Sequence, residues 1–503
     1  MLSIIINKRM KRISFVIALL SGFLFQTGLA LAADNTSTII INVGDSTQMT
    51  LKSIISKGLP VMCFETVDGE EPTCDYVSAP SGSMGASIAN ATKVPGRLVV
   101  YNKISGKDSL IYDSGDYEKD VSGMTIKIRG NTSAYDDKKP YKIKLQKKFD
   151  LLFGGNDSIY KDKEWLLLRD DYLTTTVGFM VNEMVGMPWT PRHHFVNVII
   201  NGNYRGAYLL SESVKRNPDC RLDVDKHCGY IFEYDPYWWN EDVYVKSSRH
   251  PSYNYTFKYP DSDDITEEQL AYMQTLIPPY ETSLKNGTYT DYIDVRSFAG
   301  WCLVHDLMAT KDAGGTNMYY TKYDTTAESK IVMPLTWDFD MAYRMPSAWS
   351  ASHTEHFNKL FNSTNRAMTG EFAALWREIR GTFLENAKAT MLAFNSSSEG
   401  MGLAMSASLD RLVYGRTISV YSRVISFNNW ITTRYEWIDN AIMTMNPIGD
   451  VNVDAQVNIA DVTELINLIL THDTAHDYAA DVNEDGSVNI GDVTTLINML
   501  LAH

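Results

Sequence analysis

The stretch KDAGGTNMYYTKYDTTAESKIVMPLTWDFD, from Lys311 to Asp340, decides the fold of the larger part of the chain. It follows an apolar segment, Asp294 to Ala309, whose pattern predicts a helix. The stretch itself predicts a loop, a strand, a turn and a second, apolar strand over Ile331–Trp337. Two acids, Asp338 and Asp340, directly follow that second strand. We therefore expect a carboxylate cluster at the end of a buried strand.

Three side chains in this stretch have the types and order that phosphoryl transfer requires. Asp312 and Asn317 enclose a Gly-Gly pair with the D-x-x-x-x-N spacing of the protein-kinase catalytic loop. Phosphoryl transfer uses one carboxylate near the attacking hydroxyl, and an amide and a second carboxylate that hold Mg²⁺ on the phosphates. The alternative is that Asp312 and Asn317 are ordinary turn residues, because Asp, Asn and Gly all favour turns.

Further motifs accompany this stretch in a fixed order. They are RGNTS (129–133), KKPYKIKL (138–145), EWLL (164–167), NGNYRGAYLLSE (201–212) and RYEWID (434–439). Together with WDFD (337–340), they make the chain resemble the CotH family, the spore-coat-protein-H-like atypical kinases. The resemblance spans residues 57–446 and implies an α+β fold with an atypical protein-kinase-like cleft.

The resemblance also implies roles for particular residues. Asp312 would position or deprotonate the acceptor hydroxyl. Asn317 and Asp338 would hold Mg²⁺ or Mn²⁺, with Asp340 as a further ligand or support. Lys142 would neutralise the phosphates of ATP.

The candidate nucleotide-binding residues lie on or beside predicted strands. Tyr141–Leu145 alternates, so Lys142 and Lys144 share the face opposite the apolar side chains. Lys142 is the first choice for a phosphate contact and Lys144 the second, and each has a solvated surface lysine as its alternative. Glu212 is either the ion-pair partner of the strand lysine or an edge-strand acid. Arg129 would reach a phosphate or hold a carboxylate structurally.

From Asp450 the sequence repeats itself with a period of 31 residues, because DVNVD (450–454) and Asp461 are matched by DVNED (481–485) and Asp492. Oxygen ligands at positions one, three, five, seven, nine and twelve of such a loop suit Ca²⁺. The first loop would use Asp450, Asn452, Asp454, Gln456, Asn458 and Asp461. The second would use Asp481, Asn483, Asp485, Ser487, Asn489 and Asp492.

Each of these loops runs into an apolar helix, predicted over Val462–Leu470 and Val493–Leu501. Because an entering helix is missing and position twelve is Asp, the tail resembles a small all-α dockerin. The resemblance implies calcium-dependent attachment to a cohesin domain of a scaffold, as in a cellulosome-like complex. The near-identical repeats predict two binding orientations related by a half-turn. Ala455, where the second loop has Gly486, predicts a weaker first site.

The N-terminus has the pattern of a secretory signal peptide, residues 1–32. Basic residues precede an apolar run over Ile13–Phe25, and Ala30-Leu31-Ala32 supplies a cleavage site. The run is shorter than the ~20 residues of a spanning helix. We expect a secreted protein, extracellular or in a cell-surface complex, without a membrane span after cleavage. Residues 33–56 would form an N-terminal extension, 57–446 the kinase-like domain and 447–503 the dockerin.

Composition limits the classes of partner. The 503 residues carry a formal net charge of −15, which argues against nucleic acid as a partner. The 44% hydrophobic content suffices for a sizeable core. Cys63 with Cys74, and Cys220 with Cys228, would be able to close local loops, whereas Cys302 lies inside an apolar helix and is expected to be a buried thiol.

Two functions from other classes stay open beside the protein kinase. ATP is scarce outside the cell, so the domain could be a non-catalytic adhesion or binding module. The segment Tyr230–Tyr244 is rich in aromatic residues, and dockerins usually occur in cellulosome-like complexes. Both observations suggest a carbohydrate-active component of polysaccharide degradation. Glu233 and Asp235 are too weak a signal for a glycosidase acid pair. Asp312, Asn317 and Asp338 together favour the kinase, with a protein hydroxyl as acceptor, whereas a carbohydrate would be the substrate of the carbohydrate-active alternative.

Overall fold

The computed structural model describes residues 36–502, except residues 316, 363–364, 418, 446, 453–455 and 473–476. The predicted signal peptide, Asp454 and Ala455 lie outside the described residues. None of the helices in the described part of the chain has both the length and the apolar character to cross a membrane. The five cysteines are free thiols, so the two local disulfides that the sequence allows are not formed.

Ten strands of the described chain form one mixed sheet, in the order β10-β9-β8-β6-β3-β11-β12-β1-β2, with β7 beside β6. Because β10 pairs with both β9 and β12, seven of these strands close into a ring filled by apolar side chains such as Phe64, Trp165 and Tyr208. The bounds are β1 Ile40–Val43, β2 Thr47–Thr50, β3 Val61–Thr66, β6 Val94–Ile104, β7 Lys107–Asp113, β8 Met124–Ile128, β9 Tyr141–Phe149, β10 Asp162–Leu168, β11 His193–Ile200 and β12 Asn203–Glu212.

Asn201 and Gly202 form the hairpin turn between β11 and β12, and both have positive φ, 49° and 74°. The segment expected to be an N-terminal extension of the kinase-like domain joins the same sheet. β1 pairs in parallel with β12 through Asn42 and Asn203, so this segment is part of the large sheet.

A second sheet of five strands has the order β14-β15-β13-β16-β17. Its bounds are β13 Tyr230–Asp235, β14 Tyr244–Lys246, β15 Asn254–Tyr259, β16 Met318–Lys322 and β17 Ile331–Val332. The predicted strand Ile331–Trp337 is therefore wrong beyond Val332. Pro334 lacks a backbone N–H for a ladder, and the segment runs on without strand pairing to the WDFD motif.

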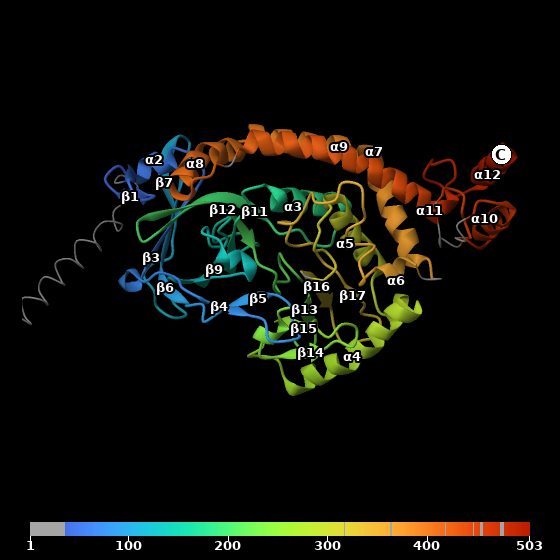
Figure 1. Ribbon diagram of the computed structural model, residues 1–503, viewed down its shortest axis with the longest axis horizontal. Coiled ribbons are helices and arrows are strands. Elements are labelled where there is room, and N and C mark those ends of the chain that lie inside the picture. Colours follow the sequence, from blue (N-terminus) through green and yellow to red (C-terminus); the bar gives the residue numbers. More distant parts are fainter. Residues whose placement is uncertain are drawn as a thin grey trace, which may run out of the picture.

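Helices cover both sheets and form a long arm along the molecule (Figure 1). They are α2 Leu51–Ile55, α3 Thr174–Val185, α4 Glu267–Asn286, α5 Val295–Met308, α6 Asn358–Phe361, α7 Ala367–Ser396, α8 Ser398–Tyr414 and α9 Val420–Met445. Arg434 of α9 is fully buried and donates hydrogen bonds to the carbonyl oxygens of Asp306 and Ala348. The RYEWID motif therefore fastens the arm to α5 and to the loop that follows WDFD.

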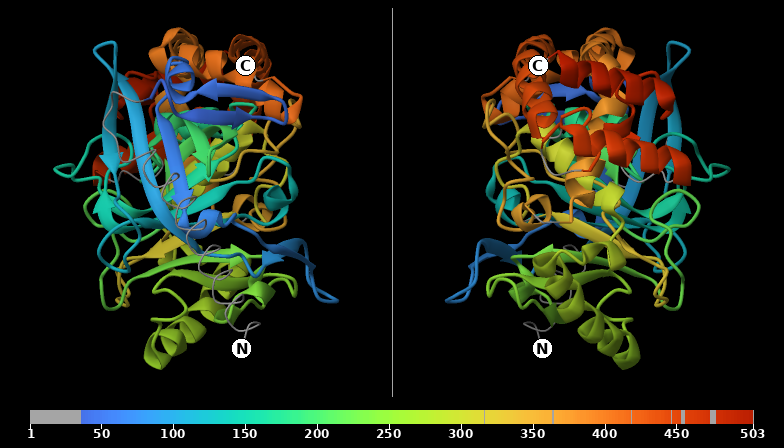
Figure 2. Two further views of the ribbon diagram at one scale, coloured as in Figure 1. Left: turned by 90° about the vertical axis from the view of Figure 1, so that its left-hand side faces the viewer. Right: turned by 90° about the vertical axis from the view of Figure 1, so that its right-hand side faces the viewer.

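The tail packs around its own small core at the end of this arm (Figures 1 and 2). Its helices are α10 Ile459–Thr471, α11 Asp477–Ala480 and α12 Ile490–Leu501. The two long helices begin three residues earlier than predicted, because Asn458 and Asn489 cap them in capping boxes with Asp461 and Asp492.

Candidate active site

A cleft of about 1040 Å³ lies between the large sheet and the five-stranded sheet, at the upper end of ligand-pocket sizes. Its wall on the large-sheet side is basic. The other wall and the floor are rich in carboxylates. The charged lining residues are Lys127, Arg129, Lys142, Arg169, Glu233, Asp235, Glu241, Lys258, Lys311, Asp312, Asp338 and Asp340, and Asn317 lies among them.

The floor of the cleft is the carboxylate cluster expected from the sequence. Asn317 donates a hydrogen bond from Nδ2 to Oδ2 of Asp338, at 3.3 Å. Both residues have left-handed φ angles, 59° and 61°, which are costly for residues other than glycine and cluster at functional sites. Asp312 and Asp340 line the same cleft. The loop after α5 and the WDFD motif thus bring the predicted residues together.

Phe339 anchors this floor from below. Its side chain is fully buried and contacts Phe179 and His305, whose ring stacks on it with centroids 5.2 Å apart. A Cβ atom placed on Gly178 of α3 would lie 2.2 Å from the Phe339 ring. Only a glycine therefore allows α3 to pack this closely against the segment that carries Asp338 and Asp340.

Like charges crowd at the carboxylate cluster. Burial, followed by the negative charges of Asp340 and Asp312, raises the pKa of Asp338 to about 7, although Arg129 acts in the opposite direction. Burial and Asp340 raise the pKa of Asp312 to about 6. Such mutual repulsion is relieved when a cation binds between the carboxylates.

The donor set at the cluster suits Mg²⁺ with a phosphate ligand better than a closed protein cage. Within the described residues, no group of three His, Cys, Asp or Glu side chains is arranged to hold a metal ion. Asn317 adds an amide oxygen to the carboxylates. Mg²⁺ is usually held by one or two carboxylates together with waters and substrate phosphates, so the residues present fit this ion.

The basic wall distinguishes the two candidate lysines. Lys142 lines the cleft, and its Nζ lies 2.7 Å from Oε2 of Glu164 on the neighbouring strand. The Lys144 Nζ lies 3.8 Å from Oε1 of the same carboxylate, with a side chain that is 59% exposed. Lys144 does not belong to the cleft lining. Arg129 does, and its charge reaches Asp338.

Glu212 does not pair with the strand lysine, so that interpretation is corrected. Its side chain is fully buried and accepts a hydrogen bond from the Arg192 backbone N–H at 3.0 Å, and Nε of Arg221 lies 3.7 Å from its other oxygen. The acid that pairs with Lys142 is Glu164, which sequence reasoning quoted only as part of the EWLL motif. The register of the two strands decides this partner. Leu166 lies directly opposite Lys142 and Glu164 directly opposite Lys144, so Glu164 is the diagonal neighbour of Lys142.

Three further charged residues that were not expected at the site line the opposite wall. Glu233 lies 3.0 Å from Nζ of Lys258, and burial raises the pKa of its carboxyl to about 7. Asp235 accepts hydrogen bonds from the Thr256 hydroxyl and the Tyr237 backbone N–H. Both acids therefore have partners within this wall, Glu233 in an ion pair and Asp235 in hydrogen bonds.

The two predicted calcium loops have the same internal hydrogen bonds. The Asp492 carboxylate accepts from the backbone N–H groups of Asn483 and Asn489, at 3.1 and 2.9 Å. Asp461 accepts from Asn452 and Asn458 in the same way, at 3.0 and 2.8 Å. In the second loop, Asp481 accepts from the N–H groups of residues 485 and 486, at 3.1 and 2.9 Å. In each loop, the carboxylate at position twelve therefore bridges the backbone of positions three and nine.

The tail also exposes a duplicated apolar surface. Ile459, Ile466 and Leu470 on α10 are 72%, 39% and 74% exposed. The equivalent residues of α12, 31 positions later, are Ile490, Ile497 and Leu501, at 71%, 38% and 81%. The two triplets have nearly equal exposure, so the tail presents the same apolar surface twice.

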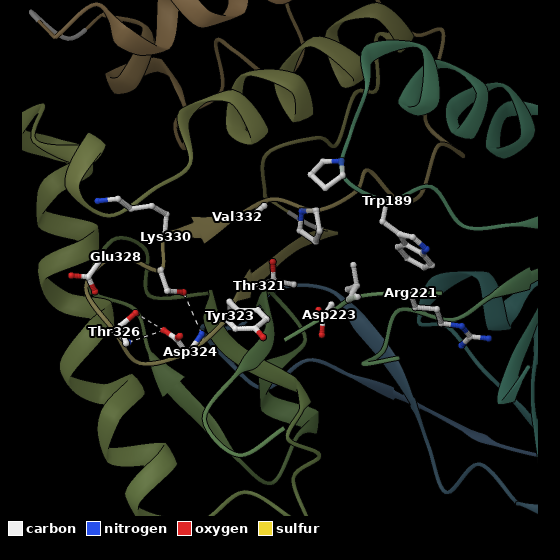
Figure 3. A pocket seen from close by; sticks show the side chains of 14 residues that line it. Trp189, Arg221, Asp223, Thr321, Tyr323, Asp324, Thr326, Glu328, Lys330 and Val332 are labelled. Atoms are coloured by element: carbon white, nitrogen blue, oxygen red, sulfur yellow. Dashed lines mark hydrogen bonds between the residues drawn. The ribbon is translucent and has the colours of Figure 1, made fainter. Parts of the chain in front are cut away.

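A second cavity of about 570 Å³ lies between the residues after α3, the segment 221–223 and the β16–β17 connection (Figure 3). The Trp189 ring on its rim donates from Nε1 to the Cys220 carbonyl oxygen at 3.2 Å. On the other side, Asp324 accepts from the Thr326 hydroxyl. None of the site residues predicted from the sequence lines this cavity.

Comparison with known proteins divides the chain as the structure does. Residues 126–382 match the family model described as CotH kinase protein, and residues 448–501 match that of the dockerin type I domain. No curated protein matches. A solved complex of the Shewanella oneidensis MR-1 toxin–antitoxin system, HipA and HipB with operator DNA, is 13% identical. The match covers 73% of this chain and 68% of the matched chain of the complex, with a TM-score of 0.23. The first matched region contains both walls of the cleft.

Proposed function

Because the chain belongs to the CotH kinase protein family and ends in a type I dockerin domain, we propose that it is a secreted, scaffold-attached phosphotransferase. It would transfer the γ-phosphoryl group of ATP to a protein hydroxyl. The observation that carries this proposal is the gathering of Asp312, Asn317 and Asp338 opposite Arg129 and Lys142 in one cleft. Carboxylates and cations on facing walls are what a metal-bound polyphosphate requires.

Each of these side chains has a role that follows from its place. Lys142, held by Glu164, and Arg129 neutralise phosphate charge on the basic wall. Asp338 and Asn317 hold Mg²⁺ or Mn²⁺, with Asp340 beside them. When bound, this ion offsets the charge of the phosphate oxygens. Asp312 orients the acceptor hydroxyl or accepts its proton, for which the raised pKa of about 6 makes it a stronger base than an ordinary aspartate.

Calorimetry of ATP binding tests this proposal. The chain would be titrated with ATP in the presence of Mg²⁺ or Mn²⁺, alongside Asp338→Ala. We expect binding by the parent chain and loss of at least about tenfold in affinity in the variant. If neither the parent chain nor the variant bound ATP, the cleft would be a feature of the family fold without nucleotide binding. A non-catalytic binding module would then be the better description.

The dockerin would attach this enzyme to a cohesin domain of a scaffold through two Ca²⁺-loaded loops. The ligands would be Asp450, Asn452, Asp454, Gln456, Asn458 and Asp461 in the first loop and Asp481, Asn483, Asp485, Ser487, Asn489 and Asp492 in the second. The parallel hydrogen bonds of Asp461 and Asp492 support two loops of the same construction. The duplicated apolar triplets on α10 and α12 support a partner surface of apolar character.

Calcium titration of the full chain tests this second part. NMR or circular dichroism should show Ca²⁺-dependent ordering of residues 449–503, and pull-down with cohesin domains should require Ca²⁺. Asp492→Ala should weaken calcium binding in the second loop. If calcium did not order residues 449–503, the proposed dockerin function would be wrong. The proposal for the cleft would not be affected.

A further inference from the structure

A small hairpin contacts both walls of the cleft. Its strands are β4 Asp75–Ser78 and β5 Ala86–Ala89. Residues 87–91 line the cleft together with residues 131–133 of the large-sheet side. On the other side, the turn accepts hydrogen bonds from Trp239 and Ser252, which lie between strands of the five-stranded sheet. The hairpin therefore belongs to neither wall alone.

Ser87 joins the two walls through one hydroxyl group. Its side chain is 1% exposed and donates a hydrogen bond to Oδ1 of Asn131, at 2.6 Å. The same Oγ accepts from Nδ2 of Asn240, at 3.2 Å, and Asn240 also donates to the Ile88 carbonyl oxygen at 3.0 Å. Asn131 belongs to the RGNTS motif that carries Arg129. Asn240 belongs to the 3₁₀ helix η4, Trp238–Asn240, beside the five-stranded sheet.

Three further contacts hold the tip of the hairpin on the side of the five-stranded sheet. Trp239 donates from Nε1 to the Met84 carbonyl oxygen at 3.2 Å, and Ser252 donates to the Gly82 carbonyl oxygen at 3.3 Å. A Cβ atom on Gly85 would lie 2.5 Å from Cε1 of Tyr237, so this turn rests directly on the ring.

The strands and the tip of the hairpin are held differently. Ile88 of β5 packs against the core of the large sheet, and Tyr76 of β4 contacts the Tyr135 ring. The tip contributes no residue to the buried core clusters, and its polar attachments are individual hydrogen bonds worth about 0.5–1.5 kcal/mol each. Segments held by few apolar contacts open locally, well before the domain unfolds. A segment of this kind across a cleft has the properties of a gate.

We propose that the β4–β5 hairpin is a strap that closes the cleft over bound nucleotide, with Ser87 as the positioning residue that links it to both walls. The strap opens for ligand exchange and, when closed, keeps water from the γ-phosphate so that transfer is favoured over hydrolysis. The nature of the ligand rests on the proposed function. The hydrogen bonds by which Ser87 joins the hairpin to Asn131 and Asn240, here called the clasp, do not depend on it.

Two glycines of the hairpin turn give a matched pair of variants. Gly85 and Gly82 have similar positive φ angles, 81° and 87°, so alanine strains the backbone equally at both. Only Gly85→Ala places a methyl group against Tyr237, because nothing lies within 4 Å of a Cβ at Gly82. Ser87→Ala removes the hydroxyl's hydrogen bonds with Asn131 and Asn240, while the hydrogen bond from Asn240 to the Ile88 carbonyl oxygen remains.

Hydrogen exchange of the full chain tests the clasp. Peptides covering residues 75–91 and 237–241 should exchange about tenfold faster in Gly85→Ala than in Gly82→Ala, which carries the backbone strain without the contact to Tyr237. They should also exchange faster in Ser87→Ala than in the parent chain. Mg²⁺–ATP should slow exchange of these peptides in the parent. Equal exchange in Gly85→Ala and Gly82→Ala would overturn the clasp.

Release of Mg²⁺–ATP, followed by stopped flow, tests the strap. We expect release about tenfold faster in Gly85→Ala than in Gly82→Ala, and faster in Ser87→Ala than in the parent chain. Equal release rates would overturn the strap while leaving the proposed function intact. If the parent chain binds no nucleotide, the proposed function and closure over ATP both fail, and hydrogen exchange still decides whether the clasp exists.

Discussion

Glu164 on β10 lies 2.7 Å from the ammonium group of Lys142 on β9, and thereby holds this lysine at the basic wall of the cleft. Burial raises the pKa of the Glu164 carboxyl, but Lys142, Lys215 and Lys144 outweigh it, so the pKa lies below its usual value. The acid is therefore ionised and fixes the lysine at neutral pH. In kinases generally, the acid partner of the phosphate-binding lysine comes from a helix. The acid partner of Lys142, the proposed phosphate-binding lysine, comes from the adjacent strand.

This relationship predicts different effects for two lysines on the same strand. Lys142→Met should weaken ATP binding by about tenfold or more, because it removes a charge from the cleft wall. Lys144→Met is the matched control, since it also removes a partner of Glu164 but lies outside the cleft lining. Calorimetry should show parent-like affinity for this control. If both variants lost the same affinity for ATP, Lys142 would contribute only its positive charge on the strand and no direct phosphate contact.

The carboxylate cluster predicts an unusual dependence of stability on pH. In the absence of metal, Asp338 titrates at about 7 in the folded chain and well below this value when unfolded. The folded state then holds a proton that the unfolded state has released. This group's contribution to stability is fully present below about pH 4 and is lost as the pH rises toward 7.

Asp338→Asn should therefore stabilise the metal-free protein at pH 8, by an amount on the order of 2 kcal/mol, and have little effect at pH 4. Urea unfolding at the two pH values measures the difference. Asp45→Asn, at an exposed position outside the cleft, serves as the control. A variant that gains stability and loses ATP binding marks a residue kept for function. A loss of stability at pH 8 would contradict the crowding of charges.

Residue types and spacing allowed the floor of the cleft to be predicted, because the chemistry requires them in that order. Asp312, Asn317 and Asp338 each follow a helix or a buried segment that the sequence pattern shows. The tail is similar, since its repeat of 31 residues identifies every loop position. The N-cap roles of Asn458 and Asn489 lie in the same repeat but were not recognised, which placed both helix starts three residues late.

Pairing between distant segments accounts for the features that the sequence did not predict. Whether Glu164 or Glu212 faces Lys142 depends on the register of β9, β10 and β12, and no local pattern specifies this register. The joining of β1 to the large sheet depends in the same way on Asn42 meeting Asn203. The apolar run up to Trp337 reads as a strand, although burial alone, without ladder pairing, explains its composition.

Gly178 predicts that the packing of α3 controls the cluster. Gly178→Ala would force the buried Phe339 ring to shift, at a cost of about 1–3 kcal/mol, and should also weaken ATP binding because Asp338 and Asp340 flank that ring. Gly381→Ala is the matched control, since it lies in the exposed interior of α7 with nothing within 4 Å of its Cβ. That change should stabilise by about 0.5–1 kcal/mol. Thermal unfolding and calorimetry compare the two.

A buried ion cluster predicts where α8 is fastened to the large sheet. The fully buried Lys138 lies 2.8 Å from both Asp171 and Asp410, and Asp410 also accepts from the Ala207 backbone N–H. Asp410→Ala should destabilise by about 2–4 kcal/mol, because it leaves a buried charge and a backbone donor partly unpaired. Glu378→Ala, which removes an exposed partner of Arg296, should cost under about 1 kcal/mol. Chemical denaturation of the two variants at neutral pH measures the contrast.

The duplicated apolar surface predicts how the tail responds to single and double changes. If a cohesin binds in two orientations that each rely on one triplet, Leu470→Asp or Leu501→Asp alone should reduce affinity by only about twofold, because one orientation remains. The double variant should lose at least about a hundredfold, since a charge then lies in the apolar contact of both orientations. Surface plasmon resonance against cohesin domains in calcium measures the affinities, and Asn467→Asp with Asn498→Asp, a polar pair with the same 31-residue spacing, is the control. A single variant as weak as the double one would mean that one orientation carries all binding.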